Sequence, residues 1–176
     1  MKRTNTPLND AFIVETKKYK DERGFFIESF NEKNFNDIGL NEKFVQDNHS
    51  RSSVNVLRGL HYQVVKPQGK LVRCMTGRVI DVIVDLRKSS STFGKHFSIE
   101  LSSPEVMLWV PVGFAHGFYC LTEVCDISYK TTDYYYKEHD RTLLWNDLDI
   151  KWPSRSPILS EKDKTGKRFS ECEKYD

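Results

Sequence analysis

Two segments of the chain carry a histidine in a setting that favours proton transfer over metal binding. One is Arg58-Gly59-Leu60-His61-Tyr62-Gln63, and the other is Pro111-Val112-Gly113-Phe114-Ala115-His116-Gly117-Phe118. A metal site needs three or four protein ligands. Gln63 stands two residues after His61, where a second histidine ligand would be needed, and no acidic residue follows until Asp81. Because histidine titrates close to neutral pH, we expect His61 to act as a base without a metal.

Basic and polar groups gather around His61 where a buried strand would be apolar. Arg58, Gln63 and Lys70 lie close to it in sequence. Strict alternation would place Arg58 and His61 on opposite faces of a strand, but a bulge at Gly59 would turn both inward. A packed or surface histidine is the alternative.

Asp81 and Tyr129 are two further candidates. Alternation along Val79 to Leu86 places Asp81 on the face opposite the apolar side chains. Asp81 is then either solvent-exposed or turned into a barrel, where it would accept a hydrogen bond from His116 and fix its tautomer. Tyr129 is either a core residue or a proton donor, whose pKa a neighbouring cation would lower.

Several polar residues are candidates for binding. Gln46 and Asn48 share a parity, so both amides could reach one ligand, although a strand end explains them equally well. Arg23 and Arg58 could grip a diphosphate, because guanidinium groups match phosphate oxygens in pairs, or could be surface charges. Tyr134 lies in an aromatic turn that suits either packing or base stacking.

The elements that must position these residues are short strands. Runs rich in β-branched and aromatic residues are interrupted by Gly, Pro, Ser or Asn, which is typical of a sandwich or barrel. One helix is expected over Glu32 to Ile38, closed by Gly39. The expected strands are Ala11 to Glu15, Gly24 to Phe30, Lys43 to Asn48, Asn55 to Gln63, Lys70 to Met75, Arg78 to Leu86, His96 to Leu101, Val106 to Val110, Gly113 to Leu121 and Asp126 to Thr132.

Composition limits the class of protein. A chain of 176 residues predicts one domain, over residues 1–163, followed by a loosely held polar tail over 164–176. The net charge of +2 without a basic stripe argues against nucleic-acid binding. We expect a cytoplasmic protein that is not bound to membranes, with reduced cysteines, because the N-terminus is polar and the four cysteines form no Cys-x-x-Cys motif.

An ordered series of motifs resembles the nucleotide-sugar 3,5-epimerases of the cupin superfamily, typified by dTDP-4-dehydrorhamnose 3,5-epimerase. The resemblance runs from about Phe12 to Lys164. The motifs, in order, are Asp21 to Glu28, Gln46 to Ser50, Val56 to Gln63, Gln68 to Arg73, Asp81 to Arg87, Pro111 to Phe118, Tyr129 to Tyr135, Trp145 to Asp147 and Leu159 to Asp163.

The resemblance implies a fold, an assembly and a set of roles. The fold would be an all-β, cupin-type jelly roll with a few short helices, and the chain would form a homodimer that shares strands, with N-terminal strands of the partner completing each site. His61 would be the base, oriented by Asp163, with Tyr129 as the acid and Lys70 stabilising negative charge. The implied substrate contacts are Arg23, Glu28, Gln46, Asn48, Arg58, His116, Tyr134, Asp140 and Lys162. Asp140 is one methylene shorter than the family's usual Glu.

The resemblance also implies a reaction: inversion of C3 and C5 of a nucleotide-linked 4-keto-6-deoxy sugar, without metal or redox cofactor. Inversion at one carbon only, or action on a GDP-linked sugar or heptose, would use the same base and acid. Two other classes remain as alternatives, a metal-dependent cupin enzyme and a non-catalytic sugar-nucleotide-binding barrel. Solvent deuterium exchange and metal content would distinguish these possibilities.

Overall fold

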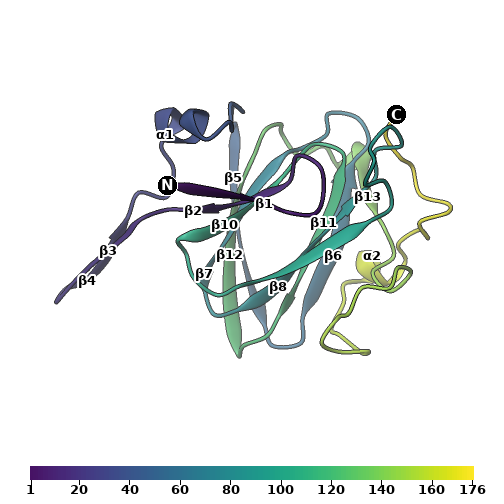
Figure 1. The fold of residues 1–176 in the computed structure, drawn as a ribbon. Helices are drawn as coiled ribbons and strands as arrows, with labels where there is room; N and C mark the ends of the chain where they lie inside the picture. The colour runs from purple at the N-terminus through teal and green to yellow at the C-terminus, as the bar shows by residue number, and fades with distance from the viewer.

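Two antiparallel β-sheets face each other in the computed structural model, which describes residues 1–176 (Figure 1). The six-stranded sheet has the order β1-β2-β10-β7-β12-β5, and the five-stranded sheet has the order β13-β6-β11-β8-β9. The first sheet comprises β1 Lys2–Asn5, β2 Phe12–Glu15, β10 Val106–Val110, β7 Lys70–Thr76, β12 Val124–Thr131 and β5 Gln46–Ser53. The second comprises β13 Asp140–Thr142, β6 Leu57–Gln63, β11 Phe114–Cys120, β8 Val79–Asp85 and β9 His96–Leu101.

All ten expected strands overlap an observed strand, so the prediction of a β-rich two-sheet fold is confirmed. The strand expected over residues 43–48 is displaced, because β5 runs over Gln46–Ser53. Three short strands were not expected: β1, β13 and β3 (Lys18–Asp21), which pairs with β4 (Gly24–Ile27). The helices are short: α1 (Glu32–Asp37), a 3-10 turn (Lys137–His139) and α2 (Glu161–Lys164).

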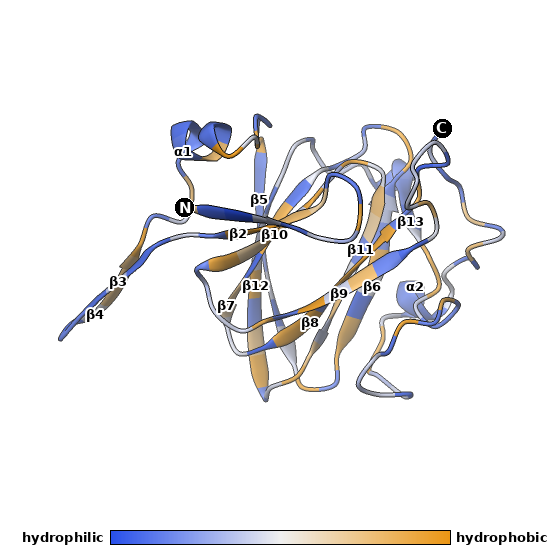
Figure 2. Cartoon of the chain, viewed as in Figure 1, coloured by the Kyte–Doolittle hydropathy of each residue, from blue (hydrophilic) through white to orange (hydrophobic).

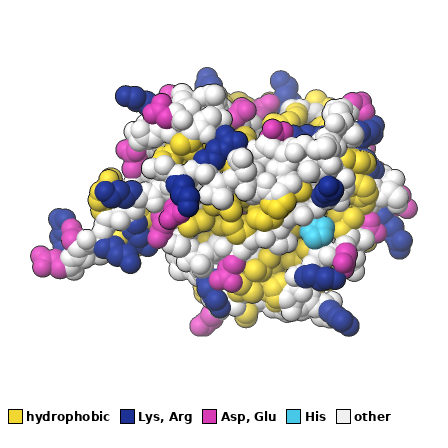
Figure 3. Space-filling view, in the orientation of Figure 1, with side chains coloured by type: hydrophobic (Ala, Val, Ile, Leu, Met, Phe, Trp, Pro, Cys, Tyr) yellow, Lys and Arg dark blue, Asp and Glu magenta, His cyan; other side chains and the backbone are white.

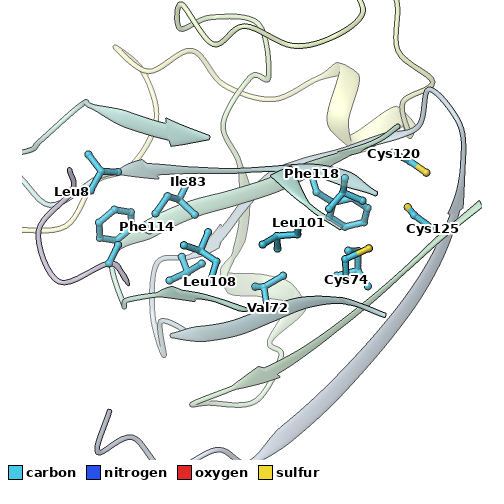
Figure 4. Close-up of a cluster of buried hydrophobic side chains, with 14 residues drawn as sticks. Leu8, Val72, Cys74, Ile83, Leu101, Leu108, Phe114, Phe118, Cys120 and Cys125 are labelled. Carbon is cyan, nitrogen blue, oxygen red and sulfur yellow. The ribbon is translucent and has the colours of Figure 1, made fainter. Parts of the chain in front are cut away.

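The space between the sheets holds the largest apolar cluster. Residues from both sheets point into it, and Figure 4 shows Phe114, Ile83 and Leu108 gathered towards one end and three cysteines towards the other. All four cysteines of the chain are free and buried. The interior is therefore apolar over much of its length.

Each sheet also packs on its outer face, which explains why β8 is buried on both sides. Val82, Val84 and Leu86 lie beneath residues of the C-terminal third of the chain, whereas Val79 and Ile83 point between the sheets. The alternation seen in the sequence is thus real, but the face that carries Asp81 turns inward rather than to solvent. The outer face of the other sheet is covered by Phe35 of α1 and its neighbours. In Figure 2 orange segments run along inner strands such as β10, β12, β8 and β11, whereas β1 and the two α-helices are largely blue.

The C-terminal segment is not loosely held, and that expectation is wrong. Cys172 is buried, Tyr175 packs against Tyr62, and Tyr175 also exchanges backbone hydrogen bonds with Leu86 and Lys88. These contacts tie the end of the chain to β6 and β8. The extent of the domain, proposed as residues 1–163, remains a prediction.

The hairpin β3–β4 projects away from the two sheets (Figure 1). It carries three exposed aromatic side chains, of which Phe26 is 67% exposed, and Figure 3 shows charged side chains around it. Exposed aromatic rings on an isolated hairpin are unusual in a monomer and mark a contact surface. No helix combines the length and apolar character required to cross a membrane.

Candidate active site

A cavity of about 390 Å³ opens between the two sheets. One sheet contributes His61 and His116, the other contributes Lys70 and Tyr129, and the segment before and within α2 contributes Asp163. The full lining is Ser50, Val56, Leu57, Arg58, His61, Lys70, His116, Gly117, Phe118, Tyr129, Ile158, Leu159, Ser160 and Asp163. The fold therefore brings together all four predicted catalytic residues.

His61 and Asp163 form a hydrogen-bonded pair. His61 Nε2 lies 2.5 Å from Asp163 Oδ1. Burial raises the pKa of Asp163, but the hydrogen bond and charge of His61, together with Ser160 and Lys162, outweigh burial, so the pKa lies below its ordinary value. An ionised Asp163 accepts the Nε2 proton and leaves Nδ1 of His61 unprotonated. The geometry thus supplies an oriented base.

The bulge expected at Gly59 is present and turns Arg58 and His61 to the same side. Between the pairs His61–His116 and Phe118–Arg58, β6 advances three residues while β11 advances two. Gly59 has φ of +125°, and a Cβ there would lie 2.6 Å from the Gly117 Cα. Only glycine fits this close approach of two strands. The bulge places both side chains in the cavity lining.

Tyr129 lies on β12, across the cavity from His61. Burial raises the pKa of Tyr129, and the nearby Arg58 opposes that effect without overcoming it. The expectation that a cation would lower this pKa is therefore wrong. A raised pKa keeps the phenol protonated at neutral pH, which is the state a proton donor needs.

Lys70 is buried at the inner end of the cavity. Its side chain is 8% exposed, and Nζ lies 3.4 Å from the carbonyl oxygen of His61. Burial lowers its pKa to about 8, with Asp140 and Asp81 acting in the opposite direction. A buried ammonium group without a bonded carboxylate is available to a developing negative charge.

His116 and Asp81 form a second buried pair. His116 Nε2 lies 3.0 Å from each carboxylate oxygen of Asp81, and Asp81 is fully buried. Of the two readings of Asp81 that the sequence left open, the structure shows the inward one, with hydrogen bonds to His116. These two contacts fix the orientation of the His116 ring, which also lies edge-on to the Tyr129 ring with the centroids 6.5 Å apart.

The other predicted binding residues, Gln46, Asn48, Asp140, Lys162 and Tyr134, lie outside the cavity lining. Side-chain contacts link the first four of them in pairs. Gln46 Nε2 donates to Asn48 Oδ1 at 3.0 Å, and the two side chains share a face as expected. Lys162 Nζ forms a short ion pair with Asp140, which also accepts a 3.0 Å hydrogen bond from the Tyr135 hydroxyl. Tyr134 is exposed.

Arg23 and Glu28 lie apart from the cavity. Arg23 sits at the tip of the projecting hairpin, paired with Asp21, and Glu28 accepts hydrogen bonds from Asn31 and Asn34. Within one chain the fold does not bring these two predicted residues to His61.

Some cavity residues were not predicted, and one of them had a recognisable signal. Ser160 caps α2, accepting a 3.2 Å hydrogen bond from the Asp163 backbone N–H. The run Ser160-Glu161-Lys162-Asp163 has the spacing of a helix-capping box, which places a hydroxyl beside the carboxylate. Ser50, Phe118, Ile158 and Leu159 carry no comparable signal.

No three His, Cys, Asp or Glu side chains are close enough together to hold a metal ion. The two histidines of the cavity are each occupied by one carboxylate. The absence of metal and cofactor stays a prediction, to be checked by metal analysis.

A two-sheet barrel in which an oriented histidine faces a half-buried tyrosine and a buried lysine defines an isomerase-type site, one built to move protons on and off carbon. Comparison with known proteins gives the same class. A family model for dTDP-4-dehydrorhamnose 3,5-epimerase matches residues 5–171. The chain belongs to the dTDP-4-dehydrorhamnose 3,5-epimerase family.

Full-length relatives support this assignment. The dTDP-4-dehydrorhamnose 3,5-epimerase of Shigella flexneri is 49% identical over 175 residues, covering 97% of each chain. That of Pseudomonas aeruginosa is 48% identical, with 98% of each chain covered. A Legionella pneumophila epimerase crystallised with dTDP-4-keto-L-rhamnose has a TM-score of 0.94 at 45% identity, with 98% of this chain and 94% of that chain covered. The predicted cupin-type fold is confirmed by this match.

Proposed function

We propose that this isomerase inverts C3 and C5 of a dTDP-linked 4-keto-6-deoxy sugar, converting dTDP-4-dehydro-6-deoxyglucose to dTDP-4-dehydrorhamnose. The observation that carries the proposal is the pair of proton-transfer groups on opposite sheets, His61 with Asp163 on one side and Tyr129 on the other. The sugar and nucleotide are inferred from relatives, among them the Legionella protein with its bound dTDP sugar and a Bacillus anthracis protein crystallised with TDP.

The chemistry follows from the ketone. The C4 carbonyl acidifies the C–H bonds at C3 and C5, and Nδ1 of His61 takes one of these protons. The C–H electron pair moves into a C=C bond, and the C4 oxygen becomes an enolate, which the Lys70 ammonium stabilises. The Tyr129 hydroxyl then gives its proton to the same carbon from the opposite face of the ring. The ketone re-forms with that centre inverted, and both side chains return to their starting states by exchange with solvent.

The remaining predicted residues suit the rest of the substrate. Arg58 already donates to Ser52 Oγ at 2.9 Å and to the Arg51 carbonyl at 3.0 Å, which holds its guanidinium group beside the cavity for a phosphate. Tyr134 offers an exposed ring for a pyrimidine, with Gln46 and Asn48 on the adjacent strand.

A homodimer forms part of this proposal. The projecting hairpin carries Arg23 and exposed aromatic rings whose ring and cation contacts are with one another and with Lys17 and Lys18, and Glu28 follows directly after it. A second copy that received this hairpin at its cavity mouth would gain a cation and a carboxylate there. Mixing inactive Arg23→Ala and His61→Asn proteins tests this, because a mixed dimer would contain one site with neither substitution and would regain activity.

Incubation with dTDP-4-dehydro-6-deoxyglucose in D₂O, followed by NMR, tests the reaction. We expect deuterium at both C3 and C5, and none with the His61→Asn variant, which should still bind dTDP. Deuterium at one carbon only would make the protein a mono-epimerase. A wild-type protein that labels neither carbon of this sugar nor of a GDP-linked 4-keto sugar would refute the proposal.

A further inference from the structure

The turn that carries the exposed tyrosines has no regular secondary structure, yet side chains from the rest of the fold hold its backbone. Three glutamines do this. Gln46 Oε1 accepts from the Tyr135 N–H at 3.1 Å, and Gln68 Nε2 donates to the Asp133 carbonyl at 2.8 Å. The third, Gln63, makes two hydrogen bonds to the turn, whereas Gln46 and Gln68 make one each.

Gln63 uses both ends of its amide. Oε1 accepts from the Tyr136 N–H at 2.6 Å, and Nε2 donates to the Tyr134 carbonyl at 3.1 Å and to the Lys66 carbonyl at 2.7 Å. The side chain is 3% exposed, so these are buried hydrogen bonds that water does not replace. The turn is therefore fixed to Gln63 on both sides of Tyr135.

The position of Gln63 in the strand gives these bonds a consequence for the site. Gln63 lies on β6 two residues after His61, and residues two apart on a strand point to the same face. The Gln63 amide, held by three hydrogen bonds, thus connects the strand that carries His61 to the turn over residues 134–136. Lys162, next to Asp163, forms an ion pair with Asp140, and Asp140 accepts a hydrogen bond from the Tyr135 hydroxyl of the same turn.

We propose that Gln63 is a positioning residue, which holds the Tyr134–Tyr136 turn in register with His61 so that a nucleobase bound on the turn places the sugar carbon at the base. This inference rests on the proposed function. Misplacement of a reacting carbon by about 1 Å costs on the order of 100-fold in rate. Loss of this register should therefore lower kcat more than it weakens nucleotide binding.

The test is a cycle of substitutions that separates positioning from general support of the strand. Gln63→Met keeps the side-chain volume and removes all three hydrogen bonds. It is made in the wild-type chain and in a chain carrying Tyr134→Ala and Tyr135→Ala, which removes the exposed rings that would hold the base. Turnover of dTDP-4-dehydro-6-deoxyglucose and binding of dTDP by calorimetry are measured for each. Gln63→Glu, which keeps the acceptor for Tyr136, serves if the Met variant does not fold.

We expect Gln63→Met to lower kcat by about 10- to 100-fold in the wild-type chain and by less than about threefold in the chain without the rings, because effects that share one path do not add. Binding of dTDP should change by less than about threefold. Tyr175→Phe is the matched control, since it removes a hydrogen bond to the Gln63 carbonyl without touching the turn, and should act equally in both backgrounds.

An equal loss in both backgrounds would show that Gln63 only supports the strand, and a Gln63→Met variant with wild-type kcat would also overturn the inference. Neither result bears on the proposed function, which fails only if the wild-type chain does not turn over the sugar.

Discussion

Lys70 should give the enzyme an alkaline limit near pH 8. The residue must be cationic to stabilise an enolate, and burial lowers its pKa from an ordinary value of 10.5 to about 8. That change corresponds to about 3 kcal/mol of lost stability of the charged form. The profile of kcat/KM against pH reports groups of the free enzyme. At pH 9 only about a tenth of Lys70 would be protonated, so kcat/KM should be about tenfold lower than at pH 7.

Tyr129 does not account for such a limit, since burial raises its pKa above the ordinary value of 10. The assay is the initial rate at low substrate concentration from pH 6 to 9.5, followed by NMR. Lys70→Met should lower kcat/KM by about 10²- to 10³-fold at pH 7 and lose the alkaline limit.

A wild-type profile that stays flat to pH 9.5 would show that Lys70 either keeps its ordinary pKa or need not be charged. A Lys70→Met variant that retained the same limit would assign it to another group. Either result would refute the prediction that the buried Lys70 ammonium sets an alkaline limit near pH 8.

Three further predictions concern single side chains. Asp163→Asn should lower kcat by about 10²- to 10⁴-fold, because the amide no longer supplies the charge that fixes the His61 tautomer, and a loss below tenfold would contradict this role. Tyr129→Phe should still exchange deuterium into the substrate through His61 but should not invert the carbon, so NMR that finds inverted product would reassign the acid. Asp85→Asn should lower the free energy of unfolding by about 2 kcal/mol at neutral pH: burial raises the pKa of Asp85, but Arg87, Ser90 and Thr92 together lower it to about 2. That stabilisation is present above the unfolded pKa near 4 and lost as pH falls towards 2, so chemical denaturation across this range should show the loss in the wild type only.

Strand pairing and the inward face could be predicted from local pattern. Alternation along β8 separated Asp81 from Val82 and Val84, and a single glycine between Arg58 and His61 predicted the bulge that unites them. These features depend on residues close together in the chain, where the pleat and the freedom of glycine decide the outcome.

Long-range contacts could not be predicted in the same way. The docking of Tyr175 and Cys172 onto β6 and β8 depends on apolar surface that the sheet exposes only once it has formed, and a segment rich in charges gives no local sign of it. The raised pKa of Tyr129 could not be predicted either, because burial by residues distant in sequence outweighs the effect of the neighbouring cation, Arg58. Gln63 shows the same limit, since two of the three hydrogen-bond partners of its side chain are backbone groups about 70 positions away.

The apolar core between the sheets and the candidate active site share one interior. Phe118 lines the cavity and also belongs to the apolar cluster between the sheets, and Tyr129 packs against that cluster. The same burial that stabilises the barrel removes water from Lys70 and makes its charge costly. An enolate that forms beside this ammonium group gives the buried charge a favourable partner. Part of the desolvation free energy of Lys70 is therefore recovered as stabilisation of the intermediate. A barrel with more water around Lys70 would impose a smaller desolvation penalty on its ammonium group and would stabilise the enolate less.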